Sequence, residues 1–394
     1  MTRAVLTLNA GSSSLKFALY TADTLRRRLA VGQLEGIGTH PHLIIRDEAG
    51  HTMIEWRWKQ ADALAAHAEV LAQIIGFLHS NMSDLDIVGV GHRVVHGGPI
   101  YEAPVVIDEE VMANLVRFTP LAPLHQPHNI TGIRAAIEAF PGVPQVACFD
   151  TAFHRRHPWV ADTYGLPYSL WEEGVRRYGF HGLSYEAVWG KLVDRAPEMA
   201  ESGRVVVAHL GSGASMCAVK AGRSVGSTMG FSTVDGLPMS TRSGSIDPGV
   251  LLWMMQEKGW DAAQITKILY KESGLKGLSG LSGDMRDLEQ SGTEGAKRAI
   301  DSFVFRVKRE ICAMTSVLGG LDAVVFTGGI GEHSALVRAR AVEGLEFLGV
   351  EIDHEANAVD APVISMPHSG VTVHVIPTDE EGVIAHHTSR LIAL

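Results

Sequence analysis

The feature that decides the fold is a turn of glycine and serine between two apolar runs, in the segment Thr7-Leu8-Asn9-Ala10-Gly11-Ser12-Ser13-Ser14-Leu15-Lys16-Phe17. One apolar run extends from Ala4 to Leu8 and the other from Leu15 to Tyr20. The pattern predicts a β-hairpin whose tip exposes backbone N–H groups and hydroxyls, with Lys16 and Asn9 beside it. Successive N–H groups at such a tip can bind phosphate, and glycine lets the ligand approach closely.

A second copy of this pattern opens the second half of the chain. A strand-like run that begins at Arg204 and contains Val205, Val206 and Val207 reaches the turn Gly211-Ser212-Gly213 and returns as an apolar run to Val219. Most turns of this composition are only turns, so one copy is weak evidence. Two matched copies predict a duplicated fold that holds a nucleotide phosphate between its halves.

Composition and charge exclude several classes of protein. The 394 residues predict two or three domains of about 100–200 residues each. The net charge is −10 and the longest basic block is Arg26–Arg28, which argues against a nucleic-acid partner. No apolar run reaches the roughly 18 residues of a membrane span, and Asn9 interrupts the first one too early for a signal peptide. We therefore expect a cytoplasmic protein with no membrane partner.

The three cysteines exclude two further kinds of site. Cys148, Cys217 and Cys312 are odd in number and have no CxxC spacing. Neither a disulfide framework nor a cysteine-rich zinc site is expected. His92 and His96 would lie about 13 Å apart on a strand, which is too far for them to share a metal ion.

The remaining elements follow from periodicity. Alternating residues predict further antiparallel strand over 39–59, and apolar residues at helical spacing predict helices over 61–78, 129–140 and 296–318. Apolar runs predict strands over 143–149, 323–326 and 371–376. The run at 323–326 leads into a glycine turn that opens a helix.

Two polar residues stand at informative places in predicted strands. Alternation puts Arg93 and Val95 on one face of a strand that runs into Gly97. A guanidinium beside an aliphatic side chain suits a short carboxylic acid, although a structural ion pair explains the same pattern. Asp150 follows another predicted strand, at the end where open α/β sheets bind ligands.

Several common nucleotide-binding motifs are missing from the sequence. There is no GxxxxGK[ST], no GxGxxG and no DFG or HRD set. A P-loop enzyme, a Rossmann dehydrogenase and a protein kinase are therefore disfavoured.

Five motifs, in this order, resemble those of the acetate kinase (acetokinase) family. They are LNAGSSSLK from Leu8, GHRVVHGG from Gly91, FDTAFH from Phe149, YGFHG from Tyr178 and TRSGSIDP from Thr241. Matching motifs extend from residue 4 to the segment Pro377–Glu380, so the resemblance covers essentially the whole chain.

The resemblance implies an α/β fold of two duplicated actin/sugar-kinase/Hsp70-like (ribonuclease H-like) domains around a nucleotide cleft. The expected domains are residues 1–150 plus 375–394, which bind the acyl group and phosphate, and residues 151–374, which bind the nucleotide and dimerise. The implied activity is reversible transfer of a phosphoryl group from ATP to acetate, giving acetyl phosphate and ADP. It implies Mg²⁺, with Mn²⁺ as a substitute, and a homodimer.

Site residues are carried over position by position. The resemblance implies catalytic roles for Asp150, His181, Arg242 and His125, and contact with the carboxylate substrate for Arg93, Val95, Leu124 and Phe180. The implied nucleotide-binding residues are Ser12, Ser14, Lys16, His209, Leu210, Gly211, Ser212, Gly213, Asp284, Met285, Arg286, Gly329, Ile330, Gly331, Glu332 and His333. The implied metal-associated residues are Asn9 and Glu380.

The chemistry agrees with these assignments. A carboxylate acceptor has a pKa near 4 and is already ionised at pH 7. No general base is needed, and the site has only to neutralise the transferring phosphoryl group and align it. Arg242, His181, Arg93 and Mg²⁺ suit this task, and we expect Asp150 to position Mg²⁺ or its waters.

This chain departs from the family pattern at a few positions. Ser212 and His333 stand in the nucleotide segments where asparagine is usual, Asp379 replaces another asparagine, and Thr233 replaces a proline that walls the acetate methyl group. A propionate or butyrate kinase is therefore an alternative. A non-catalytic ATP-binding regulator on the same fold is disfavoured, because the charged residues are all present.

Overall fold

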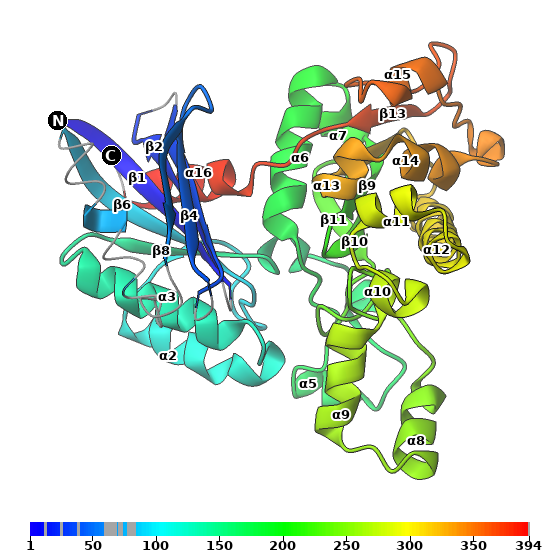
Figure 1. Ribbon diagram of the computed structural model, residues 1–394, viewed down its shortest axis with the longest axis horizontal. Helices are drawn as coiled ribbons and strands as arrows, with labels where there is room; N and C mark the ends of the chain where they lie inside the picture. Colours follow the sequence, from blue (N-terminus) through cyan, green and yellow to red (C-terminus); the bar gives the residue numbers. More distant parts are fainter. Residues whose placement is uncertain are drawn as a thin grey trace. The chain divides into compact units, whose positions relative to one another are not determined.

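A computed structural model describes residues 1–11, 14–23, 27–37, 40–58, 69, 74–76 and 84–392. The chain forms two compact units (Figure 1). The first unit contains Met1–Arg155 and Asp379–Leu394, and the second contains Arg156–Thr378. The chain thus passes between units at 155/156 and 378/379, a few residues after the expected boundaries at 150/151 and 374/375.

The first unit is built on an eight-stranded sheet with the order β5-β4-β3-β2-β1-β6-β8-β7. Its strands are β1 (Thr2–Ala10), β2 (Ser14–Thr21), β3 (Arg28–Glu35), β4 (His42–Asp47), β5 (Thr52–Arg57), β6 (Leu85–Val94), β7 (Val105–Val106) and β8 (Gln145–Phe149). The strands β1 to β5 pair antiparallel in succession, and β6 lies parallel to both β1 and β8. The hairpin predicted from the first glycine turn is confirmed as β1–β2.

Helices cover both faces of this sheet. Among the described residues of this unit, the helices and short turns are α2 (Glu109–Arg117), η2 (Thr119–Leu121), α3 (Gln126–Ala139), η3 (Ala152–His154) and α16 (Glu380–Leu391). On one face α3 packs Ile130 and Ile133 against apolar residues of β6 and β8. On the other face Ala385 of α16 packs against Val5 and Ala18.

The close approach of α16 requires a glycine in β6. A Cβ on Gly91 would lie 2.3 Å from Thr388 Oγ1 and 2.5 Å from Ile384 Cγ2, both on α16. Any larger residue at position 91 would therefore push the helix away from the sheet. The position of α16 matters because its first residue, Glu380, belongs to the site described below.

The second unit repeats the strand order of the first. Its sheet runs β11-β10-β9-β12-β13, from β9 (Arg204–Leu210), β10 (Ala214–Lys220), β11 (Arg223–Ser227), β12 (Ala323–Thr327) and β13 (Thr372–Val375). The strands β9, β10 and β11 pair antiparallel, whereas β12 lies parallel to β9 and β13. The strands β3-β2-β1-β6-β8 of the first sheet have the same order and directions as β11-β10-β9-β12-β13 of the second. The duplication predicted from the two glycine turns is therefore confirmed.

Helices surround the second sheet, with α6 and α12 on either side of it (Figure 1). The helices before β12 are α4 (Trp159–Asp162), α5 (Tyr168–Glu172), α6 (Gly182–Arg195), α7 (Met199–Ser202), α8 (Pro248–Glu257), α9 (Ala262–Lys267), η4 (Ile268–Glu272), α10 (Gly274–Ser279), α11 (Met285–Ser291) and α12 (Glu294–Leu318). Those after β12 are α13 (Gly328–His333), α14 (Ala335–Val342), η5 (Glu346–Leu348) and α15 (His354–Ala358).

Most of the predicted elements are found with small shifts at their ends. The helix predicted over 129–140 is α3, which begins earlier because Pro127 occupies its first turn, where a missing N–H costs nothing. The helix predicted over 296–318 is α12, capped by the Thr293 side chain. The helix predicted over 61–78 lies almost entirely outside the described residues. Within the described ranges, none of the helices combines the length and the apolar character needed to cross a bilayer.

Candidate active site

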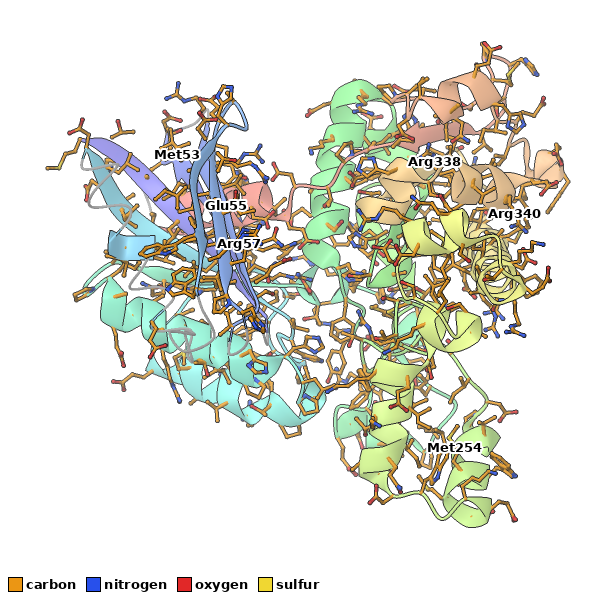
Figure 2. All side chains as sticks on the ribbon, viewed as in Figure 1. Met53, Glu55, Arg57, Met254, Arg338 and Arg340 are labelled. Atoms are coloured by element: carbon orange, nitrogen blue, oxygen red, sulfur yellow. The ribbon has the colours of Figure 1, made fainter. Side chains whose placement is uncertain are left out.

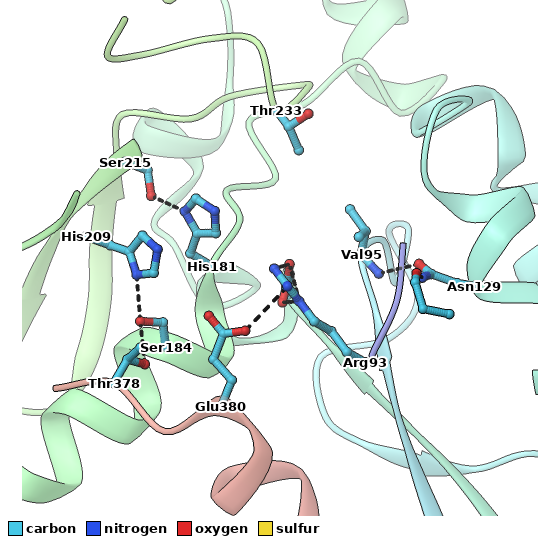
Figure 3. Close-up of polar contacts among 12 residues, drawn as sticks. Arg93, Val95, Asn129, His181, Ser184, His209, Ser215, Thr233, Thr378 and Glu380 are labelled. Carbon is cyan, nitrogen blue, oxygen red and sulfur yellow. Dashed lines mark hydrogen bonds and ion pairs between the residues drawn. The ribbon is translucent and has the colours of Figure 1, made fainter. Parts of the chain in front are cut away.

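In the first unit, Arg93 lies between two carboxylates (Figure 3). Its Nε donates to Asp150 Oδ1 at 3.0 Å and its Nη2 donates to Oδ2 at 2.7 Å. On its other side, Nη1 lies 3.4 Å from Glu380 Oε2. The Asp150 side chain is 2% exposed and the Arg93 side chain 20% exposed. The Nε–Nη2 edge of the guanidinium is therefore bound by Asp150, and Nη1 also lies beside Glu380.

Sheet geometry brings these three residues together. Arg93 is the last residue but one of β6, and Asp150 directly follows β8, which pairs with β6 in parallel. Parallel neighbours end at the same edge of a sheet, and the Asp150 N–H donates to the Val94 carbonyl at 3.0 Å. Glu380 reaches this edge as the first residue of α16.

The charges around Arg93 shift the pKa of their neighbours. Burial alone would lower the pKa of Arg93, but the carboxylates of Asp150 and Glu380 outweigh burial and raise it, so the guanidinium stays charged. Burial and the nearby charge of Glu380 raise the pKa of Glu381. The carboxylates of Asp150, Glu380 and Glu381 thus all act on Arg93, an environment that favours positive charge.

An asparagine that the sequence analysis did not single out connects this edge to the first hairpin. The Val95 N–H donates to Asn129 Oδ1 at 3.0 Å, and Asn129 Nδ2 donates to the Ala10 carbonyl at 2.9 Å. Asn129 is 4% exposed, so its side chain fixes the ends of β1 and β6 relative to each other. His125 lies one residue before α3, on the same helix end.

The first glycine turn places Asn9 and Lys16 opposite each other across β1 and β2. Lys16 is exposed, and the Gly11 N–H donates to the Ser14 carbonyl at 2.9 Å. Ser12 lies outside the described residues. The oxygen donors of Asn9 and Glu380 are of the kind that Mg²⁺ prefers, and Mg²⁺ keeps most of its waters. Among the residues that the structure describes, no group of three or more His, Cys, Asp or Glu forms a ready-made metal site.

In the second unit, two histidines stack beside the second glycine turn. The rings of His181 and His209 lie 4.3 Å apart at an angle of 24°. His181 Nδ1 lies 2.8 Å from Ser215 Oγ, and the His181 backbone adopts φ of 58°, a left-handed conformation that is rare outside glycine. Such strain is typical of functional sites.

Arg242 and His181 converge on the turn at Gly213. A Cβ on Gly213 would lie 2.8 Å from Arg242 Nη2 and 3.2 Å from His181 Nε2. Arg242 Nη1 donates to the Thr233 carbonyl at 2.7 Å, which directs its other nitrogens. Because Gly213 has no side chain, the Arg242 guanidinium and the His181 ring can both approach the backbone of this turn.

Two of the predicted nucleotide segments, 209–213 and 329–333, lie close together in this unit. A Cβ on Gly211 would lie 3.8 Å from the Gly329 N, and Gly328 adopts φ of 77° against the Leu210 carbonyl. The third segment begins α11, where Asp284 caps the helix and pairs with Arg286. Ser334, which caps α14, also donates to Glu289 of α11. His333 is largely exposed and faces Asp360 at 3.7 Å.

The residues expected to contact the substrate differ in exposure. Val95 is 8% exposed and Leu124 is 38% exposed in the first unit, and Phe180 is 1% exposed in the second. Phe180 precedes His181 directly, whereas Leu124 lies just before α3.

Sequence reasoning missed Arg338, which shapes a third glycine turn, the segment Gly328-Gly329-Ile330-Gly331. This side chain, labelled in Figure 2, is 0% exposed within the second unit. Its Nη1 donates to the carbonyls of Gly331 and Glu332 at 3.0 and 2.8 Å, and its Nε donates to Asn357 Oδ1 at 2.8 Å. It therefore satisfies carbonyls at the end of α13. A lone arginine in a helix gave no sign of this role.

The comparisons with known proteins agree on one family. The model of the acetokinase family matches residues 4–386. An acetate kinase of Methylocella silvestris is 54% identical over 100% of this chain and 98% of its own length. One of Rhodopseudomonas palustris is 48% identical over 99% of both chains.

Solved structures agree. Acetate kinase of Porphyromonas gingivalis is 36% identical, with a TM-score of 0.90 over 99% of this chain and 100% of that chain. A propionate kinase of Francisella tularensis is 37% identical, with a TM-score of 0.92 over the same shares.

The duplicated sheets and their glycine turns thus define a phosphotransferase of the actin/sugar-kinase/Hsp70-like fold class. Its activity is that of a kinase acting on acetate. The chain belongs to the acetokinase family.

Proposed function

We propose that this enzyme transfers the γ-phosphoryl group of ATP directly to the carboxylate of acetate, in line, and that Arg93 binds that carboxylate. The observation that carries the proposal is the position of Arg93, which Asp150 holds through Nε and Nη2. Glu380 lies 3.4 Å from Nη1, so the acetate carboxylate would meet the N–H groups of Nη1 and Nη2 that point away from both acidic side chains, and a carboxylate fits such a pair of donors. Asp150 then orients the guanidinium, and its carboxylate would also position waters of the metal.

The residues around the second glycine turn would bind the phosphates. Arg242 and His181 lie against Gly213, where they can neutralise the charge of the transferring phosphoryl group. His209 to Gly213, with the segments 284–286 and 329–333, would bind the rest of the nucleotide. Backbone N–H groups of a glycine turn suit phosphate oxygens.

Magnesium would be held by Asn9 and Glu380 in the first unit. Hard oxygen donors, one amide and one carboxylate, fit this ion, and the carboxylates near Arg93 support a cation there. When bound, the ion would neutralise charge on the phosphates of ATP. We infer Mg²⁺ as the physiological ion, with Mn²⁺ as a substitute.

Proton transfer has no part in the proposed reaction. The acceptor is already a carboxylate at neutral pH, so the enzyme gains rate by alignment and by charge neutralisation. The expected setting is the cytoplasm.

The test is formation of acyl hydroxamate from ATP, Mg²⁺ and hydroxylamine, with acetate, propionate and butyrate compared by kcat/KM. We expect acetate to be used best. Arg93→Ala should raise KM for the acid, whereas Arg340→Ala, which removes a surface pair with Asp301, should change nothing. Equal KM values for the wild type and Arg93→Ala would overturn the role of Arg93.

A propionate kinase is the second candidate because of Thr233. Its carbonyl anchors Arg242, and the resemblance to the family motifs implies a proline at its position. If propionate is preferred, Thr233→Pro should shift the kcat/KM ratio toward acetate. If acetate is preferred in both forms, Thr233 is a tolerated change.

We also propose that the enzyme is a homodimer that associates through α8. All ten residues of α8 are described, and none of them is buried. Val250, Leu252, Trp253 and Met255 are each 40–56% exposed, and Figure 2 marks the neighbouring Met254 on this helix. An apolar helix exposed in this way indicates a protein interface. Trp253→Glu should therefore give a monomer in sedimentation experiments, whereas Phe347→Glu, at an exposed site elsewhere, should not.

A further inference from the structure

A chain of two hydroxyl groups ends on His209 in the second unit. His209 Nδ1 lies 2.8 Å from Ser184 Oγ, and Thr378 Oγ1 donates to Ser184 Oγ at 2.8 Å (Figure 3). The three residues come from β9, from α6 and from the segment after β13. We call Thr378, Ser184 and His209 the hydroxyl chain.

The direction of the hydrogen bonds determines the tautomer of His209. Because Thr378 donates to Ser184, the Ser184 hydroxyl is left to donate to His209 Nδ1. In the neutral ring the proton then lies on Nε2. Nε2 lies 3.9 Å from the place of a Cβ on Gly211, so it is directed at the second glycine turn.

Burial makes this arrangement costly to lose. Ser184 is 0% exposed, so bulk water cannot replace its hydroxyl when a partner is removed. His209 also stacks on His181. A change in the hydrogen bonding of His209 would therefore alter the position of both rings.

Thr378 has a second connection, to the third glycine turn. Glu332 Oε1 accepts hydrogen bonds from the Gly328 N–H at 2.9 Å and from the Thr378 N–H at 3.3 Å. One residue thus contacts the segment 328–333 through its backbone and His209 through its side chain and Ser184.

The place of Thr378 in the chain adds a third connection. Thr378 is the last residue of the second unit, and Asp379 begins the second segment of the first unit. Two residues further on, Glu380 lies beside Arg93. Thr378, the member of the hydroxyl chain farthest from His209, is therefore the last residue before the polypeptide passes from the second unit to the first.

We propose that Ser184 and Thr378 are positioning residues that hold His209 as the Nε2–H tautomer, so that it donates to a phosphate oxygen at the second glycine turn. Thr378 links this donor to the nucleotide segment through Glu332. The inference rests on the proposed role of His209 in nucleotide binding, but the tautomer itself can be measured without any activity.

The first experiment is ¹⁵N NMR of the histidine-labelled enzyme, with the His209 signals assigned from a His209→Gln sample. At pH values where the ring is neutral, the wild type should show the Nε2–H tautomer. Ser184→Ala and Thr378→Val should both shift His209 toward a mixture of tautomers, whereas Thr378→Ser should behave as the wild type does. An unchanged tautomer in Ser184→Ala would overturn the proposal.

The second experiment separates positioning from folding. Ser184→Ala and Thr378→Val should each lower kcat about 3- to 30-fold, with little change in KM for acetate. The double variant should be no slower than Ser184→Ala alone, because both changes break one chain. Thr315→Val, which also removes a buried threonine hydroxyl bonded within the unit, is the control and should keep full kcat. Effects that multiply in the double variant would contradict the proposal.

Failure of the proposed function would give a different result. If His209 does not contact phosphate, the tautomer shifts would persist while kcat stayed at the wild-type value in both variants. This outcome overturns the catalytic part of the inference. If Ser184→Ala does not fold, Thr378→Val compared with Thr378→Ser gives the same test, since Thr378 is only partly buried.

Discussion

Arg242 is the residue whose loss should affect catalysis most. Its Nη1 is held by the Thr233 carbonyl and its Nη2 lies against Gly213. If it stabilises the phosphoryl group as an arginine finger does, Arg242→Ala should lower kcat on the order of 10³-fold. Arg340→Ala serves as the matched control, because Arg340 pairs with Asp301 on the surface. A kcat within a few-fold of the wild type would exclude the role.

Asp150 gives a second prediction at the same scale. Asp150→Asn keeps the shape of the side chain but removes the charge that faces Arg93. Because a hydrogen bond between charged groups is lost, kcat/KM for acetate should fall about 10- to 100-fold. The pH dependence of the remaining activity should stay unchanged, since no proton is removed by Asp150. The initial rates from pH 6 to 9 measure this, with Asp322→Asn, which breaks the Arg204 pair, as the control.

Prediction from the sequence succeeded where the signal was local. The positions of Arg93 and Asp150 at strand ends follow from alternation and from short apolar runs. Asn129 could not be found in this way, because its two partners lie 34 and 119 positions away. Thr378 and Ser184 are separated by 194 positions. Roles of individual residues came from the family motifs, since charge and spacing alone left Arg93 open between a substrate contact and an ion pair.

At the scale of elements, the beginning of α16 determines where Glu380 lies. Asp379 caps the helix by accepting from the Gly382 N–H at 3.1 Å, and the Tyr20 hydroxyl donates to the same oxygen at 3.2 Å. Burial and the carboxylates of Asp379 and Glu381 raise the pKa of Tyr20, so its hydroxyl stays a donor. Through Asp379, β2 is thus hydrogen-bonded to the first turn of α16, which carries the candidate metal residue Glu380.

Removal of this cap should weaken the helix. Asp379→Ala should lower the free energy of unfolding by about 1 kcal/mol, the usual cost of losing an N-cap. Asp379→Asn restores the residue that is usual in the family and can still accept both hydrogen bonds, so it should cost much less. Denaturant midpoints of the two variants and the wild type measure the difference. Equal losses would show that the charge of Asp379, and not its capping, stabilises α16.

The whole molecule should lose stability in mild acid, because the first unit buries neutral histidines. Burial lowers the pKa of His92 to about 4 and that of His96 to about 3. In the unfolded chain a histidine has a pKa near 6.5. Below about pH 6.5 the unfolded state therefore binds more protons than the folded state does. The free energy of unfolding decreases as the pH is lowered toward 4. The limiting slope is about 1.4 kcal/mol per pH unit for each histidine.

A variant separates this effect from general acid denaturation. In His92→Gln, the new side chain can still donate to Gln145, the partner of His92, but it does not titrate. The decrease in the denaturant midpoint between pH 7 and pH 5 should be smaller than in the wild type. His354→Gln, at an exposed histidine, should leave the decrease unchanged. A decrease in His92→Gln as steep as in the wild type would contradict the prediction.

The duplication was visible in the sequence at this largest scale because both glycine turns carry the same local pattern. That the two sheets have the same strand order could be seen only in the structure, since strand order depends on pairings between distant segments. The same is true of α8, whose exposed apolar residues stand out only when their surroundings are known.

The first unit is made from two segments that are far apart in the sequence, and this has a consequence for biosynthesis. Residues 156–378 are translated between Arg155 and Asp379. At about 5–20 residues per second, a ribosome takes roughly 10 to 45 seconds to make them. During this time the nascent sheet lacks α16, and Gly91 faces the place that the helix will fill. A chaperone that shields this apolar face would act in that interval, before Glu380 reaches Arg93.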